Sequence, residues 1–93
     1  MEMTSYEQGT PCWVDIGTSD LDAACAFYSS VFGWEIERGP AEMGHYSMAR
    51  VRGLDVAALA DQQVPGMVVW TTYLAVDDVD ATTATAVAEG ATV

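Results

Sequence analysis

The sequence contains no lysine, and its only basic side chains are Arg38, Arg50 and Arg52, against 14 acidic ones. The formal net charge over the 93 residues is therefore −11. Proteins that bind nucleic acid use lysine and arginine to neutralise phosphates and release counterions, and this chain has almost none of either. The same shortage disfavours an anionic membrane surface. We therefore expect no nucleic-acid partner and no membrane partner.

Long apolar runs and cysteine clusters are also missing. No apolar run approaches the roughly 20 residues that cross a bilayer, and the N-terminus lacks the basic start of a signal peptide. The two cysteines, Cys12 and Cys25, form no C-x-x-C motif and no metal-binding cluster with histidine. We interpret them as free thiols that pack as small hydrophobic residues in a reducing compartment, and we predict a cytoplasmic protein.

Apolar residues make up 51% of the chain, enough for the core of one small domain. Residues 1–10 show no periodicity and are expected to form a flexible arm. Residues 11–17 alternate in polarity, which predicts a strand with Trp13 and Asp15 on one face. The opposite face of this strand is apolar and consists of Cys12, Val14 and Ile16.

A helix is predicted after this strand, with Ser19 or Asp20 as its N-cap and Gly33 at its end. Its apolar stripe consists of Leu21, Ala24, Cys25, Tyr28, Val31 and Phe32. Three further strands are predicted at residues 34–38, 45–51 and 55–60, followed by a linker at residues 61–67. Residues 11–60 thus form one unit with the order strand, helix, strand, strand, strand.

The pattern then begins again. Residues 68–76 are predicted to form an apolar strand, and the acidic residues from Asp77 to Asp80 open a second helix that ends at Gly90. Aligning Asp78 with Asp20, an offset of 58 residues, repeats the order of strand and capped helix. Residues 68–93 are therefore interpreted as an incomplete second unit.

Two segments carry a family resemblance: WVDIGTSDLDAACAFYSSVFGW at residues 13–34 and WTTYLAVDDVDATTATAVAEGATV at residues 70–93. Both resemble the vicinal oxygen chelate superfamily of glyoxalases, bleomycin-resistance proteins and extradiol dioxygenases. The closest similarity is to actinobacterial glyoxalase-like tandem proteins labelled hydroxylases. The resemblance implies an α+β fold of βαβββ units, in which each sheet curls into half of a cup around a ligand cavity.

The positions that the resemblance assigns to metal ligands hold Trp13 and Thr71 here, and the predicted strand at residues 55–60 lacks the usual glutamate. Divalent metals need clustered imidazole, carboxylate or thiolate donors. We therefore predict that the cup holds no metal and no other cofactor.

The predicted cup interior contains one ionisable candidate and several candidates for ligand contact. Asp15 is the candidate catalytic residue, as a hydrogen-bond acceptor or a base. The candidate ligand-binding residues are Trp13, Tyr46, Met48, Thr71 and Tyr73. His45 is interpreted as a surface or strand-edge residue, and Arg50 and Arg52 as solvated charges paired with nearby acids.

Three hypotheses about function follow. The first is a glyoxalase-like small-molecule enzyme of unknown reaction with a metal-free cup. The second is a non-catalytic protein that sequesters a planar drug or metabolite by stacking on aromatic rings. The third is a truncated fragment of a longer tandem protein. Because an open half-cup exposes apolar surface, we also expect either a homodimer, with possible exchange of residues 68–93, or a longer native chain.

Overall fold

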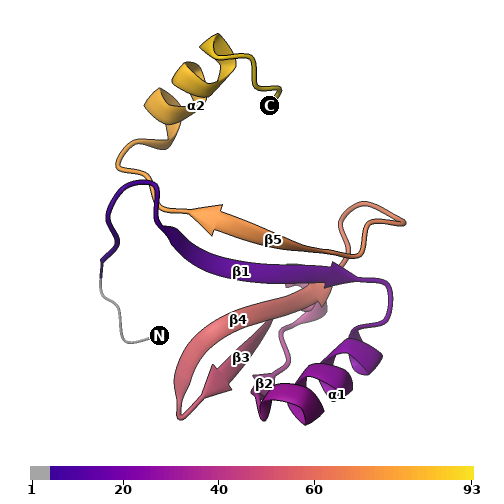
Figure 1. Ribbon diagram of the computed structural model, residues 1–93. Helices are drawn as coiled ribbons and strands as arrows, with labels where there is room; N and C mark the ends of the chain where they lie inside the picture. The colour runs from indigo at the N-terminus through magenta and orange to yellow at the C-terminus, as the bar shows by residue number, and fades with distance from the viewer. Residues whose placement is uncertain (1–4) are drawn as a thin grey trace.

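A computed structural model describes residues 5–93 and confirms the α+β class, with one five-stranded sheet and two α-helices (Figure 1). The elements are β1 (Pro11–Thr18), α1 (Leu21–Phe32), β2 (Glu35–Glu37), the 3₁₀ turn η1 (Ala41–Met43), β3 (Ser47–Val51), β4 (Leu54–Asp61), β5 (Val69–Leu74) and α2 (Val79–Ala88). Residues 1–4 of the predicted arm lie outside the described residues. Within the remainder of that arm, the Gly9 N–H donates a hydrogen bond to the Ala75 carbonyl at 2.7 Å.

The strands lie in the order β2-β3-β4-β1-β5. β1 therefore lies between β4 and β5, and β5 comes from the segment that follows the predicted linker. β1 runs parallel to β4, and Asp15 lies opposite Ala58. On its other side β1 runs antiparallel to β5, with Trp13 opposite Tyr73 and Asp15 opposite Thr71. Opposite residues on neighbouring strands project to the same face of a sheet. This register therefore gathers the predicted cup residues of β1 and β5 on one face.

Helix α1 begins where the acidic cap predicts and ends at the predicted glycine. The Asp20 side chain accepts a hydrogen bond from the Ala23 N–H at 3.0 Å, which satisfies one free donor of the first turn. Gly33 adopts φ +68°, a left-handed conformation that a glycine reaches without steric cost.

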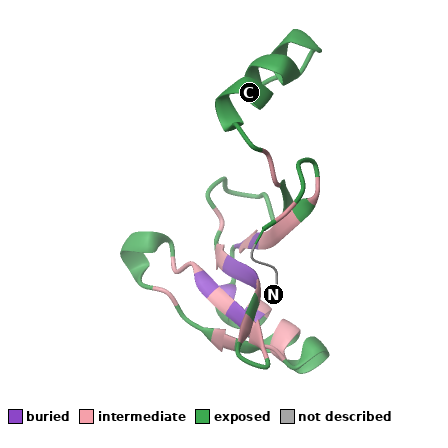
Figure 2. Cartoon of the chain, turned by 90° about the vertical axis from the view of Figure 1, so that its left-hand side faces the viewer, coloured by how far each residue is buried: buried purple, intermediate pink, exposed green. Residues whose placement is uncertain are grey.

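The core lies between α1 and one face of the sheet, which we call the helix face. Its buried residues are Ile16, Leu21, Cys25, Ala49, Ala57 and Leu59. Figure 2 shows this buried region as a small patch on neighbouring strands, surrounded by partly exposed residues. Cys25 is buried in this core, whereas Cys12 is only half-buried, and both are free thiols. The core is small because alanines occupy several of its central positions.

Strand β3 starts at Ser47, two residues later than the sequence predicted. The reason is His45, whose φ of +53° is incompatible with an extended strand. The turn η1 precedes it, and the Tyr46 N–H donates to the Met43 carbonyl at 3.2 Å. A compact turn therefore occupies the place where the polarity pattern alone suggested the beginning of a strand.

Helix α2 has the predicted N-cap, because Asp78 accepts a hydrogen bond from the Ala81 N–H at 3.0 Å. All of its residues are nevertheless exposed, including the apolar Val79 and Val87. The helix projects past β5 on the side away from β1 (Figure 1). Helix α2 therefore has no packed face comparable to that of α1. Neither helix of residues 5–93 is long and apolar enough to cross a membrane.

The two matched N-caps allow a stability test. Asp20→Ala is expected to lower the free energy of unfolding by about 1 kcal/mol, because it removes the cap of a helix that packs on the core. Asp78→Ala removes the same kind of cap from an exposed helix, so the free energy of unfolding should stay within about 0.5 kcal/mol of the parent. Urea denaturation followed by tryptophan fluorescence measures both values. Equal losses in the two variants would contradict the difference in packing.

Candidate functional site

The face of the sheet opposite α1, which we call the cup face, carries an aspartate surrounded by aromatic side chains. Asp15 lies on β1, and Tyr73 reaches it from β5. Tyr46 reaches it from the segment before β3, and Trp13 lies two residues earlier on β1. Three separate segments of the chain therefore converge on one carboxylate.

Hydrogen bonds connect these four side chains into a single network. The Tyr46 hydroxyl donates to Oδ2 of Asp15 at 2.8 Å, and the Tyr73 hydroxyl donates to Oδ1 at 3.3 Å. The Trp13 Nε1–H in turn donates to the Tyr46 oxygen at 2.9 Å. Each carboxylate oxygen of Asp15 thus accepts one hydrogen bond from a phenol. This pattern orients the carboxylate and offsets the cost of placing a charge in a partly buried position.

The two phenols bind their protons more tightly than an isolated tyrosine. Burial raises the pKa of the Tyr46 phenol, and the hydrogen bond to Asp15 raises it further, while the hydrogen bond from Trp13 lowers it. The hydrogen bond to Asp15 is the main cause of the raised pKa of Tyr73. Both phenols are therefore protonated donors at neutral pH, and Asp15 is their common acceptor.

A pocket of about 230 Å³ opens beside this network. Four of the predicted site residues line it: Asp15, Tyr46, Thr71 and Tyr73. The other walls come from β1, the end of β4, the following loop and the start of β5: Ile16, Gly17, Ala60, Asp61, Gln63, Val64, Met67 and Val69. The pocket therefore combines apolar walls with a few polar groups, as ligand sites do.

Two predicted ligand-binding residues lie outside the lining of this pocket. Trp13 reaches it only through its hydrogen bond to Tyr46. Met48 lies on β3 opposite Ala58, and Ala58 in turn lies opposite Asp15. On the cup face Met48 therefore lies two strands away from Asp15, across β4. The structure thus groups Trp13 with the site through its network and leaves Met48 further along the cup face.

The donors of the cup face do not fit a divalent metal. Asp15 already accepts hydrogen bonds from two phenols, and Trp13 and Thr71 occupy the ligand positions that the family resemblance implies. Within residues 5–93, no three side chains of His, Cys, Asp or Glu gather closely enough to hold a metal ion. We therefore derive no chemical step through a metal.

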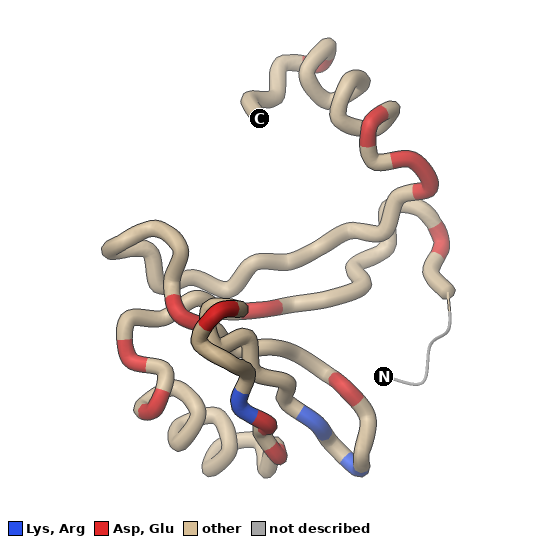
Figure 3. The backbone as a smooth tube through the Cα atoms, turned by 180° about the vertical axis from the view of Figure 1, so that it is seen from behind, with Lys and Arg blue, Asp and Glu red and all other residues tan. Residues whose placement is uncertain are grey.

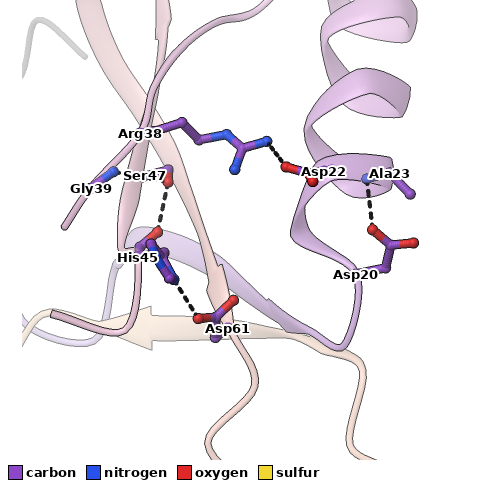
Figure 4. Close-up of polar contacts among 8 residues, drawn as sticks. All are labelled: Asp20, Asp22, Ala23, Arg38, Gly39, His45, Ser47 and Asp61. Carbon is purple, nitrogen blue, oxygen red and sulfur yellow. Dashed lines mark hydrogen bonds and ion pairs between the residues drawn. The ribbon is translucent and has the colours of Figure 1, made fainter. Parts of the chain in front are cut away.

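A second polar cluster, missed from the sequence, lies where α1 begins (Figure 4). His45 Nδ1 lies 2.6 Å from Asp61 Oδ2, and the Ser47 hydroxyl donates to the His45 carbonyl at 2.6 Å. Arg38 donates to Asp22 at 2.6 Å. Asp61 also lines the pocket beside Asp15, so the pair with His45 connects the segment before Tyr46 to the pocket wall. His45, expected to be a surface or strand-edge residue, has a partly exposed side chain that pairs with Asp61.

Arg50 agrees with the interpretation of a charge paired with nearby acids. Arg50 donates to Asp55 at 2.7 Å and to Glu37 at 3.0 Å. Arg52 occupies an exposed turn with φ +53°. Arg50 is thus already engaged by two carboxylates, and neither it nor Arg52 lines the pocket at Asp15.

A group of aromatic rings lies on the helix face, the opposite face of the sheet from the side chain of Asp15. Its members, which we call the helix-face cluster, are Phe27, Tyr28, Phe32, Trp34 and Trp70. The Trp70 Nε1–H donates to the Tyr28 hydroxyl at 3.1 Å, which joins β5 to α1. Phe27 and Phe32 remain more than half exposed. This cluster is the second place on the chain where a planar ligand could stack.

The curled sheet, the helix on one face and the polar cup on the other define a glyoxalase-like class of domain. A family model described as "Glyoxalase-like domain" matches residues 13–93, and the chain belongs to this family. The resemblance to the vicinal oxygen chelate superfamily is thereby confirmed.

Two named relatives show the same similarity. The chain is 48% identical over 85 residues to "Putative glyoxylase CFP32" of Mycobacterium tuberculosis, an alignment that covers 84% of the chain and 32% of that protein. It is 35% identical over 98 aligned positions to "Anthracycline biosynthesis protein DnrV" of Streptomyces peucetius, covering 87% of the chain and 35% of that protein. The chain thus spans about a third of the length of these relatives.

The network around Asp15 predicts a distinct alkaline titration. Asp15→Asn is expected to lower the pKa of Tyr73, because the hydrogen bond to the Asp15 carboxylate is the main cause of its rise. Phenols with a raised pKa stabilise the folded state below the ordinary tyrosine pKa of about 10, and this stabilisation is lost as the pH rises through the raised pKa. Ultraviolet phenolate absorbance measures the titration, with Asp80→Asn on the exposed α2 as a control. Identical curves for the parent and Asp15→Asn would contradict the network.

Proposed function

We propose that the chain acts on a planar small molecule in a metal-free cup, as an enzyme whose proton acceptor is Asp15. The observation that carries this proposal is the position of Asp15: its carboxylate lines a pocket and is held by phenols from two other segments of the chain. A carboxylate held in this way keeps lone pairs directed at a bound molecule. The enzyme would then catalyse a proton transfer, in which Asp15 takes a proton from a hydroxyl group or from a carbon beside a carbonyl group of the substrate.

The surrounding residues support a planar and partly polar ligand. Tyr73 lines the pocket and can offer ring surface to a bound molecule, and Trp13 lies opposite it on β1 and borders the site through its hydrogen bond to Tyr46. Thr71 and the two phenols add groups that hydrogen-bond to oxygen atoms. The walls formed by Val64, Met67 and Val69 supply apolar contact. A hydroxylated aromatic or polyketide-like compound satisfies all three requirements.

The names of the relatives agree with this class of ligand. One relative is named for anthracycline biosynthesis and another as a glyoxylase, and both names refer to proteins that act in small-molecule chemistry. We treat the activity of the whole relatives as a hypothesis for this chain, because the chain spans only about a third of their length.

A non-catalytic binding protein is the second candidate, and one observation favours it. Each oxygen of Asp15 already accepts a hydrogen bond from a phenol, so both oxygens have a partner before any ligand binds. In that case Asp15 would only anchor a ligand hydroxyl while the aromatic rings stack on the ligand. The two candidates differ in whether the bound molecule is converted.

We also propose that the chain works in the cytoplasm and as an assembly rather than as an open half-cup. The free thiols of Cys12 and Cys25 are consistent with a reducing compartment. Residues 68–93, which we interpret as the start of a second unit, contribute only β5 and the exposed α2. The pocket at Asp15 is therefore bounded by few elements on its β5 side.

Substitution at Asp15 distinguishes the enzyme from the binding protein. In the enzyme, Asp15→Asn is expected to reduce conversion by a factor of about 10² to 10⁴, because it removes the proton acceptor. Binding of quinizarin, a planar dihydroxyanthraquinone, should change by less than about threefold, because the asparagine oxygen still accepts a hydrogen bond. Mass spectrometry of a metabolite extract incubated with each protein measures conversion, and fluorescence titration measures binding. Asp80→Asn should match the parent in both.

Equal conversion by the parent and Asp15→Asn would remove Asp15 from the mechanism. Trp13→Ala adds an independent measurement, because loss of its ring and of its hydrogen bond to Tyr46 should weaken quinizarin binding about tenfold. An unchanged affinity of Trp13→Ala would contradict the stacking pocket, whatever the outcome at Asp15.

Metal analysis tests the other part of the proposal. Because the cup face lacks a suitable donor set, we expect the purified protein to contain no stoichiometric zinc, nickel, iron or manganese, and chelation should leave quinizarin affinity unchanged. Elemental analysis by mass spectrometry gives the metal content directly. One equivalent of any of these metals, or loss of binding after chelation, would overturn the metal-free cup.

A further inference from the structure

The hydroxyl of Tyr46 reaches Asp15 across a whole strand. Tyr46 directly precedes β3, Asp15 lies on β1, and β4 lies between these two strands. The phenol nevertheless donates to Oδ2 of Asp15 at 2.8 Å, and it also accepts the Trp13 Nε1–H. Because the hydroxyl lies at the end of a long side chain, a small rotation of the backbone at Tyr46 would break both contacts. The conformation of the segment before β3 therefore decides whether Asp15 keeps this partner.

His45, the residue before Tyr46, has an unusual backbone conformation. Its φ is +53°, a region that most side chains avoid and in which histidine is one of the more frequent exceptions. The His45 N–H donates to the Pro40 carbonyl at 3.0 Å, which closes the turn. A conformation of this kind persists only where the surrounding contacts hold it. The contacts that hold His45 thus also determine the direction of Tyr46.

The imidazole of His45 fastens this turn to β4. Its Nδ1 lies 2.6 Å from Oδ2 of Asp61, the last residue of β4 (Figure 4). An ionised aspartate only accepts hydrogen bonds, so Nδ1 carries the proton whether the ring is neutral or charged. The Asp61 N–H in turn donates to the Gly44 carbonyl at 3.0 Å. Asp61 therefore holds the segment before Tyr46 twice, once through its backbone and once through its side chain.

A buried hydroxyl holds the same segment from the other side. Ser47 is fully buried, and its hydroxyl donates to the His45 carbonyl at 2.6 Å and accepts the Gly39 N–H at 3.2 Å. Gly39 itself has no room for a side chain, because a Cβ there would overlap the Tyr46 carbonyl oxygen. The backbone at Tyr46 is therefore enclosed by Gly39 and Ser47, and the side chain of His45 fixes it to β4.

The charge distribution makes His45 the basic partner of Asp61. Acidic residues occur along the chain, whereas the three arginines lie between the end of β2 and the turn before β4 (Figure 3). Arg38, which lies in the same polar cluster, pairs with Asp22 at 2.6 Å. Arg50 is held by two other carboxylates. Asp61 thus pairs with the imidazole while the neighbouring arginine is engaged elsewhere.

We propose that His45 is a positioning residue for Tyr46. Its pair with Asp61 keeps the Tyr46 hydroxyl on the carboxylate of Asp15. His45 does not line the pocket beside Asp15, so it acts through Tyr46 and not by touching a ligand. The positioning of Tyr46 stands on the geometry of the chain without ligand, whereas its effect on binding rests on the proposed function.

Two substitutions at His45 separate its side chain from its backbone. Glycine and asparagine both tolerate a positive φ, so both variants should fold. His45→Gly removes the contact with Asp61, whereas His45→Asn keeps an amide N–H that can donate to it. His45→Gly should lower the pKa of Tyr46 toward the ordinary tyrosine value of about 10, because burial and the hydrogen bond to Asp15 raise it. In His45→Asn the pKa of Tyr46 should match that of the parent.

Carbon-13 NMR of labelled tyrosine follows the titration of each phenol separately. Tyr73 is the internal control, because its raised pKa depends mainly on its own hydrogen bond to Asp15 and should not change. Asp22→Asn is the matched control variant, since it removes an equally short ion pair from the same polar cluster and should leave Tyr46 unchanged.

An unchanged titration of Tyr46 in folded His45→Gly would overturn the proposal. Equal shifts of Tyr46 and Tyr73 would do the same, because they would indicate a general loosening of the fold. A shift in His45→Asn as large as that in His45→Gly would also contradict it. If His45→Gly fails to fold, Asp61→Ala removes the same pair from the β4 side and should lower the pKa of Tyr46 in the same way.

A double-mutant cycle tests the consequence for binding. His45→Gly should weaken quinizarin binding about threefold in the parent and leave it unchanged in a Tyr46→Phe background, because both residues act through one hydroxyl. Equal losses in the two backgrounds would contradict the positioning role. A parent that does not bind quinizarin would refute only the proposed function, since the titration of Tyr46 without ligand still decides the role of His45.

Discussion

Strand β1 supplies apolar side chains to the core and polar side chains to the cup face, on alternate residues. Ile16 points into the small core beneath α1, while Asp15 points to the cup face and lines the pocket. The strand also pairs on both sides, parallel to β4 and antiparallel to β5. The core, the pocket and the attachment of the last third of the chain therefore all depend on the register of β1. A one-residue slip would exchange its two faces and place Asp15 in the core.

The site follows from the need to hold a carboxylate at this position. A partly buried charge is costly unless hydrogen bonds compensate for it, and Tyr46 and Tyr73 supply two of them. Trp13 then orients the phenol of Tyr46. The same contacts that make Asp15 tolerable in the fold also aim it at the pocket. Stability and recognition are thus linked through one side chain.

The sequence predicts the elements well where local chemistry determines them. Asp20 and Gly33 delimit α1, and alternation of polarity correctly predicts that Trp13 and Asp15 share a face. The hydrogen bonds among Asp15, Tyr46 and Tyr73 could not be predicted, because they depend on how three segments curve toward one another. Which of these residues contact a ligand remains a prediction.

The pair of His45 and Asp61 could not be predicted from the sequence, because it depends on the register between β3 and β4. Counting back from the turn between β3 and β4 pairs Arg50 with Asp55, and the same count would place His45 opposite Ala60. An irregularity between Ala49 and Arg50 shifts the register by one residue, which brings His45 level with Asp61. Bulges of this kind leave little trace in the polarity pattern.

We propose that the ligand binds on the cup face and not on the helix face. The molecule itself offers the alternative, since the helix-face cluster also presents aromatic rings. Chemical-shift mapping of the protein during titration with quinizarin tests the claim most directly. We predict that the largest changes occur at the Trp13 indole N–H and at the backbone amides of Asp15 and Tyr73. The largest changes at the indole N–H groups of Trp34 and Trp70, with Trp13 unaffected, would contradict it.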